Sequence, residues 1–229
     1  MTQSQDRSGP IFLEPGVGSS YGNGWRQLWK NFLELLLVLI IAWAVSAAFS
    51  IIGPFIDNTV WNFINAVFSI FVSGPLAYGA YYASLHAARG DRVEMSDLFA
   101  AFSRNYLNAV IASVLVAIIV AVGFILLIVP GIIFLCKLAF VPYLVVDKRM
   151  DAITAIKTSW NWTNGHAGTI FLMGLLTIPI SILGFIALGV GIIPAVMWIS
   201  VAFASQFHAV DLKQRPPQAE PVAPGGPFI

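Results

Sequence analysis

A single lysine interrupts one of the most apolar stretches of this 229-residue chain. Lys137 lies within residues 128–150, six residues after Gly131 and ten before Asp147. At 1.5 Å per helical residue, it lies about 9 Å from one end of a helix and about 15 Å from the other. An unpaired lysine in a bilayer costs roughly 2.5–3.5 kcal/mol on insertion scales, so we expect Lys137 to have a partner.

Two acidic residues are candidates for pairing with Lys137, and the expected depths favour Asp57. Helical side chains lean toward the helix N-terminus, so the ammonium group should reach away from the Asp147 end, toward the side of Asp57. Glu34 leans toward the opposite side of the membrane. The ammonium group could also snorkel to a lipid phosphate or bind carbonyl groups that Pro142 frees. The predicted intramembrane polar site is therefore Lys137, Asp57 and Glu34, with lipid or Asp57 pairing favoured over a substrate or proton site.

Histidines offer a second kind of chemistry, but only if the fold brings them together. His86, His166 and His208 each lie near the end of a different apolar segment. A metal site would need them to converge with acidic residues from elsewhere, which are Asp91, Asp147 and Asp211. No HExxH motif or Gly-x-Ser-x-Gly elbow is present. We therefore predict no catalytic, metal-binding or cofactor-binding residues and no enzymatic activity.

The composition indicates that the chain folds in a lipid bilayer and not in water. Hydrophobic residues make up 58% of the chain and charged residues only 10%, against about 45–50% and about 25% in soluble domains. So few charges cannot cover a water-soluble surface, so the chain belongs in a bilayer. The net charge of +1 says little, because in a membrane protein the placement of charges matters more than their sum, and we expect no nucleic-acid partner.

Six segments are long and apolar enough to span the hydrocarbon core, which takes about 20 helical residues. They are residues 32–52, 61–87, 107–128, 131–146, 167–188 and 191–210. Short Gly/Pro breaks separate the third from the fourth and the fifth from the sixth, and such breaks permit tight reversals. The predicted fold class is all-α, a polytopic membrane protein with six transmembrane helices arranged as three helical hairpins.

Basic residues predict the orientation. With six spans, every basic residue except Lys137 falls in the N-terminal segment, the second or fourth connection, or the C-terminal tail. These residues are Arg7, Arg26, Lys30, Arg89, Arg92, Arg104, Lys148, Arg149, Lys157, Lys213 and Arg215. The positive-inside rule therefore predicts that both termini face the cytoplasm.

A recurring pattern precedes each outward helix. Asn is followed by an aromatic residue at positions 31–32, 105–106 and 161–162. Aromatic and apolar residues upstream follow helical spacing, which predicts short amphipathic helices in the inner interface. The candidate lipid-interface residues on them are Trp25, Trp29, Arg104, Trp160 and Trp162.

The inward helices contain prolines and glycines, and Pro142 is the clearest break. A proline inside a span frees a backbone carbonyl, which neighbouring helices, hydroxyl groups or water must satisfy. Broken helices also line transporter sites, but small residues such as Gly74 and Ala77 favour helix packing. The predicted domains are a disordered cytoplasmic N-terminus (1–23), a membrane domain (24–210) and a disordered Pro-rich cytoplasmic tail (211–229).

Several short motifs resemble the bacterial glycerophosphoryl diester phosphodiesterase membrane-domain superfamily and its uncharacterised YciC-like relatives. They are Val129-Pro130-Gly131, Phe140, Pro142-Tyr143, Asp147, Ala152, Ala155, Ser159 and Gly165-His166, with an opening from Gly24-Trp25 to Asn31. The resemblance implies a six-helix protein of the bacterial cytoplasmic membrane with no established activity. Some members carry a cytoplasmic phosphodiesterase barrel after the membrane domain; residues 211–229 are too few for one, so no such activity transfers.

The expected function is a non-enzymatic membrane module that organises lipid or a partner protein at the inner interface. Its expected partners are membrane lipid and a membrane or cytoplasmic protein, and its small-residue faces are also compatible with a homo-oligomer. The alternative is a small transporter or lipid-handling protein with a site around Lys137 and the Pro-broken inward helices.

Overall fold

The structure is a computed structural model that describes residues 13–53, 57–186 and 191–214. Over these residues the chain is helical and contains no β-strand. Six of its helical segments are long and apolar enough to cross a membrane: Phe32–Ser50, Asn58–Arg89, Tyr106–Leu126, Ile128–Val146, Ala167–Ile186 and Ile192–Gln214. The predicted all-α class and the six apolar spans are thereby confirmed.

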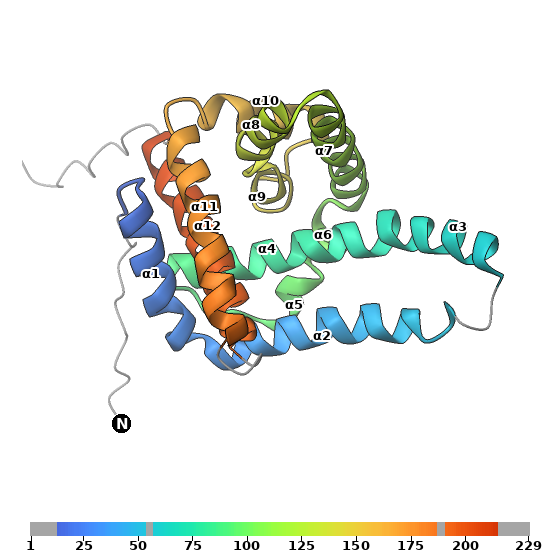
Figure 1. Cartoon of the computed structure of the whole chain (residues 1–229). Coiled ribbons are helices and arrows are strands. Elements are labelled where there is room, and N and C mark those ends of the chain that lie inside the picture. Colours follow the sequence, from blue (N-terminus) through green and yellow to red (C-terminus); the bar gives the residue numbers. More distant parts are fainter. Residues whose placement is uncertain (1–12, 54–56, 187–190, 215–229) are drawn as a thin grey trace, which may run out of the picture.

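The helices follow one another with short connections (Figure 1). In chain order they are α1 (Val17–Lys30), α2 (Phe32–Ser50), α3 (Asn58–Phe68), the π-helical turn η2 (Ser69–Ser73), α4 (Gly74–Arg89), α5 (Met95–Leu98), α6 (Ala100–Arg104), α7 (Tyr106–Leu126), α8 (Ile128–Leu138), α9 (Val141–Val146), α10 (Ala152–Trp162), α11 (Ala167–Ile186) and α12 (Ile192–Gln214).

The first prediction to be corrected is the position of the turn between the third and fourth spans. The chain reverses at Leu127, whose backbone is extended (φ −169°, ψ 157°), and not at the predicted Val129-Pro130. Pro130 lies in the first turn of α8, where a residue without an N–H is tolerated because that donor has no partner within the helix. Beyond the turn, α7 and α8 pack closely through Gly123 and Gly131, because a Cβ on Gly123 would lie only 2.9 Å from the Gly131 Cα.

Pro142 separates α8 from α9, and a neighbouring helix packs against the break. The Ser159 hydroxyl on α10 donates to the Lys137 carbonyl at 2.7 Å, and the Phe140 N–H donates to the same hydroxyl oxygen at 3.3 Å. The Thr163 hydroxyl also points to the Lys137 carbonyl, at 3.5 Å. Hydroxyl side chains thus pair with backbone groups of Lys137 and Phe140 beside the break, whereas the carbonyl that Pro142 itself frees is that of Leu138, four residues earlier.

The core lies where helices far apart in sequence meet, at the C-terminal half of α4, α9 and the C-terminal half of α12. Its largest fully buried side chains include Tyr143, Phe140 and Phe207, with Tyr143 stacked on Phe207 at 4.8 Å. In contrast, α2 and α3 project away from this core side by side, joined by the stacked rings of Phe49 and Phe68 (Figure 1). The apolar surfaces of such projecting helices suit contact with lipid.

Helix α1 begins inside the segment 1–23 that was predicted to be disordered, so that boundary is wrong. Its Asn23 amide donates to the Ala88 carbonyl and to the Ser205 hydroxyl, both at 2.9 Å. Gly24 lets the helix pack directly on the backbone of α12. The Gly/Ser-rich composition that suggested disorder therefore serves close helix packing. At the other end, α12 continues to residue 214, and the rest of the predicted tail and residues 1–12 lie outside the described residues.

Gly79 provides a test of the contact between α4 and α5. A Cβ on Gly79 would lie 1.7 Å from the Leu98 carbonyl oxygen, so one of the two backbones would have to move. We expect Gly79→Ala to lower the free energy of unfolding by about 3 kcal/mol, at the severe end for an overpacked site. Gly174→Ala is the matched control, since a Cβ there meets nothing within 4 Å, and it should raise stability by up to about 1 kcal/mol. Thermal unfolding in mild detergent measures both, and equal stability of the two variants would contradict the packing described.

Candidate functional site

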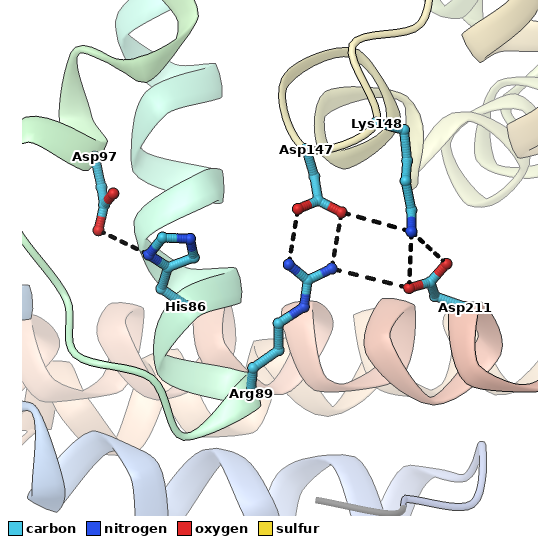
Figure 2. A network of polar contacts seen from close by, with 6 residues as sticks. All are labelled: His86, Arg89, Asp97, Asp147, Lys148 and Asp211. Carbon is cyan, nitrogen blue, oxygen red and sulfur yellow. Dashed lines mark hydrogen bonds and ion pairs between the residues drawn. The ribbon is translucent and has the colours of Figure 1, made fainter. Parts of the chain in front are cut away.

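Four charged side chains meet where α4, α9 and α12 end (Figure 2). Arg89, the last residue of α4, makes a two-pronged contact with Asp147, with Nη–Oδ distances of 2.7 and 2.8 Å. Lys148 lies 2.9 Å from an oxygen of Asp211 on α12. Two longer contacts of 3.9 Å, between Arg89 and Asp211 and between Lys148 and Asp147, close the group. We call these four residues the ion cluster.

The ion cluster is largely buried and electrically balanced. Relative exposure of its side chains ranges from 2% for Asp211 to 26% for Lys148, and two cations face two carboxylates. Burial by itself would raise the pKa of Asp147, but the hydrogen bonds and charge of Arg89 outweigh burial and lower it below its usual value. The Asp147 carboxylate is therefore stabilised in its ionised form by Arg89.

A second polar contact lies one turn away on α4. His86 Nδ1 is 3.1 Å from Asp97 Oδ2, and the same oxygen accepts the Glu94 N–H at 2.9 Å. That N–H bond belongs to a capping box in which Glu94 and Asp97 stabilise the start of α5. The His86 contact thus fixes α5 against α4.

The three histidines do not form the metal site that the sequence analysis considered. Among the described residues, no group of three or more His, Cys, Asp or Glu side chains could hold a metal ion. The structure does bring Asp147 and Asp211 together, but Arg89 and Lys148 lie between them. Positive side chains at that position occupy the carboxylates and repel a metal cation.

Lys137 has neighbours other than the expected Asp57. Its ammonium group donates to Asn164 Oδ1 and lies 5.6 Å from the centre of the Trp160 ring. Asp57 instead caps α3, accepting the Thr59 N–H at 2.8 Å. Pairing with Asp57 was inferred from depth alone, whereas α10 packs beside α8 and brings an uncharged amide to the lysine; snorkelling to a lipid phosphate stays a prediction. Glu34, the third member of the predicted polar site, lies partly exposed in the first turn of α2.

The predicted lipid-interface residues divide into two groups. Trp25 and Trp29 are 46% and 55% exposed on α1, and Trp160 is exposed beside Lys137. Arg104 lies over the Tyr82 ring at 4.6 Å, which is a cation–π contact within the protein. Trp162 is partly buried and stacks on Phe207 at 6.1 Å, so its ring faces the core.

An apolar cavity of about 240 Å³ lies between α1, α11 and α12. Its walls are almost entirely apolar, and indole rings contribute prominently to them. The lining residues are Trp25, Trp29, Ile180, Leu183, Gly184, Gly191, Pro194, Ala195 and Trp198. Such a surface can hold a hydrocarbon chain but has few groups to orient a polar substrate.

Sequence reasoning missed both the ion cluster and this cavity. A signal for the cluster was present, because opposite charges end three different apolar segments on the same predicted side of the membrane. No comparable signal identified the cavity, since its lining residues come from three helices whose relative rotation the sequence leaves open. Comparison with protein-family models, with curated proteins and with solved structures found no match for the chain.

The ion cluster predicts a non-additive effect of two substitutions. Asp147→Leu alone should lower the free energy of unfolding by roughly 3 kcal/mol, because it leaves Arg89 buried without its closest partner. The double variant Arg89→Met/Asp147→Leu should recover much of this loss, because Lys148 and Asp211 then remain as a balanced pair. Thermal or denaturant unfolding in mild detergent checks both. If the double variant loses the sum of the two single effects, the residues do not act as a cluster.

The same cluster predicts how stability depends on pH. Since the pKa of Asp147 is lowered on folding, its contribution is fully present above the unfolded pKa of about 3.9 and is lost as pH falls through the lower folded value. We therefore expect the unfolding midpoint to fall between about pH 4 and pH 2. Arg89→Met/Asp147→Leu should lack this part of the fall, whereas Asp91→Asn, at an exposed position, should retain it.

Proposed function

We propose that the protein is a non-enzymatic module of the bacterial cytoplasmic membrane that organises anionic lipid around α1. In this proposal both termini face the cytoplasm. The lipid site lies next to the α11–α12 turn, because Gly184 and Gly191 line it together with Trp25 and Trp29, so α1 does not lie in an interface opposite that turn. The motif resemblance to the glycerophosphoryl diester phosphodiesterase membrane-domain superfamily supports such an assignment, without a catalytic activity.

The apolar cavity is the observation on which the proposal depends. An acyl chain placed there would contact the Trp25, Trp29 and Trp198 rings, and indole rings favour the boundary between hydrocarbon and headgroups. Arg26 and Lys30, both exposed on α1, alternate with the two α1 tryptophans. Basic residues near a membrane surface attract anionic lipid by about 1 kcal/mol each, so α1 combines an apolar site with a cationic rim.

The ion cluster is a poorer site for an anionic substrate than α1 is for anionic lipid. Arg89 and Lys148 already contact two carboxylates at hydrogen-bonding distance. An anionic substrate would have to displace those carboxylates from a largely buried position, at a cost of several kcal/mol. The exposed cations of α1 bear no such cost.

The transporter alternative receives less support from the broken helices. A transport site built on the Pro142 break would use the backbone groups that the proline frees. Ser159 on α10 bonds to the Lys137 carbonyl and the Phe140 N–H next to the break, so α10 already packs against this side of it.

Lipid-dependent stability tests the proposal. Phosphatidylglycerol added to the protein in mild detergent should raise its unfolding midpoint more than phosphatidylcholine does, because only the former is anionic. Arg26→Ala/Lys30→Ala should weaken phosphatidylglycerol binding by about 30-fold, which corresponds to about 2 kcal/mol for two basic residues. Arg92→Ala/Lys213→Ala, which removes two exposed cations elsewhere, is the matched control.

Substitution of the tryptophans that line the cavity tests its role in the same experiment. Trp25→Ala/Trp29→Ala should reduce stabilisation by both lipids, because it removes acyl-chain contacts and not charge. Trp43→Ala, at a 67%-exposed position on α2, should not. Equal stabilisation of all variants by both lipids would refute lipid binding at α1.

A further inference from the structure

The turn between α7 and α8 is apolar on all sides. Residues 117–135 have no polar or charged side chain, and five consecutive aliphatic residues are highly exposed at the turn. Their relative exposures are 83% for Ile125, 65% for Leu126, 70% for Leu127, 68% for Ile128 and 66% for Val129. By contrast, the connection from α2 leads into α3 through polar residues, which are Asp57, Asn58 and Thr59. Five exposed aliphatic residues in a row suit hydrocarbon and not water.

Polar side chains at the contact between α8 and α10 mark the level at which the surroundings of the α7–α8 pair change from polar to apolar. We call Lys137, Asn161 and Asn164 the polar collar; Lys137 bonds Asn164, and Asn161 and Asn164 are exposed. Helix α10 reaches this level from the base, since Ala152 N–H donates to Asn108 Oδ1 near the start of α7. The exposed Lys157 lies one turn below the collar on the same helix. These side chains belong in the headgroup region, because each costs free energy in hydrocarbon.

On α8, the distance from the polar collar to the turn is too short for a crossing, although the 21 residues of α7 are by themselves long enough for one. The part of α8 between Lys137 and Ile128 rises about 13.5 Å at 1.5 Å per residue, whereas the hydrocarbon core is about 30 Å thick. Tilting α8 would only reduce the depth reached. For the turn to emerge on the far side, the whole polar collar would have to lie near the middle of the bilayer.

Two backbone hydrogen bonds close the turn. The Leu127 N–H donates to the Gly123 carbonyl at 3.1 Å, and the Gly131 N–H donates to the Leu127 carbonyl at 3.3 Å. Pro130 has no N–H to satisfy, which reduces the number of donors that the first turn of α8 leaves without a partner inside the helix.

We propose that the α7–α8 turn ends near the middle of the bilayer, so that this helix pair occupies one leaflet as a wedge and does not cross the membrane. The sequence analysis placed this turn in water on the far side. The wedge adds apolar volume to the leaflet that faces the termini, whichever leaflet that is. The proposal is independent of lipid binding at α1, because it depends on α7, α8 and α10 alone.

Depth measurements on spin-labelled protein in lipid vesicles test the wedge. Cys136 is replaced by alanine, and single cysteines are placed at Asn161, Ile133 and Val129, all exposed positions. Oxygen and a water-soluble nickel complex then report the depth of each label, calibrated with spin-labelled lipids of known depth. We expect the nickel accessibility to fall steadily from Asn161 through Ile133 to Val129, with Val129 matching a label near the end of an acyl chain.

The direction of the change separates the two topologies. In a crossing pair, Val129 would lie nearer the far surface than Ile133, so its nickel accessibility would rise and the wedge would be refuted. A hydrocarbon depth for the Asn161 label would refute it equally, since the polar collar would then be embedded. Each variant must elute as a single species and keep the parent unfolding midpoint. If Val129→Cys does not fold, Ile125→Cys at the most exposed position replaces it, with the same two readings.

Discussion

The ion cluster is the contact on which the arrangement of the helices depends. Apolar helices in lipid gain little from burying more apolar surface against one another, because the lipid tails are as apolar as their side chains. Buried opposite charges are different, because a buried charge that has lost its partner lowers the stability of the fold strongly. Arg89, Asp147, Lys148 and Asp211 come from α4, from α12 and from the end of α9. Their mutual requirement holds three helix ends at one point, beside the buried core that α9 forms with the C-terminal halves of α4 and α12.

Around that point the polar interactions are short and local, and they decide what each surface can do. Ser159 bonds to the backbone beside Pro142, His86 and Asp97 fix α5, and Asn23 fixes α1 to α4 and α12. With these polar groups engaged, the exposed cations of α1 and the indole rings beside them are available to lipid. The proposed function follows from this division between internal and external polar groups.

The sequence predicts the helices better than their contacts, for identifiable physical reasons. Span lengths follow from hydropathy, and the break at Pro142 follows from its missing N–H, so both were predictable. The partner of Lys137 was not, because Asp57 and Asn164 differ in the rotation and packing of whole helices, which no local pattern encodes. The start of α1 was missed because Gly and Ser are common both in disordered segments and at close helix contacts. The charges of the ion cluster were visible in the sequence, but only three-dimensional packing shows which cation meets which carboxylate.

The bond from Ser159 to the Lys137 carbonyl also sets an order of events during synthesis. Ser159 emerges from the ribosome after both α8 and α9, so the backbone beside Pro142 has no hydroxyl partner when those helices first reach the membrane. Water or the translocation machinery must serve that carbonyl until α10 follows. Maturation of this part of the fold is therefore tied to the passage of a later segment, since the chain supplies Ser159 only with α10.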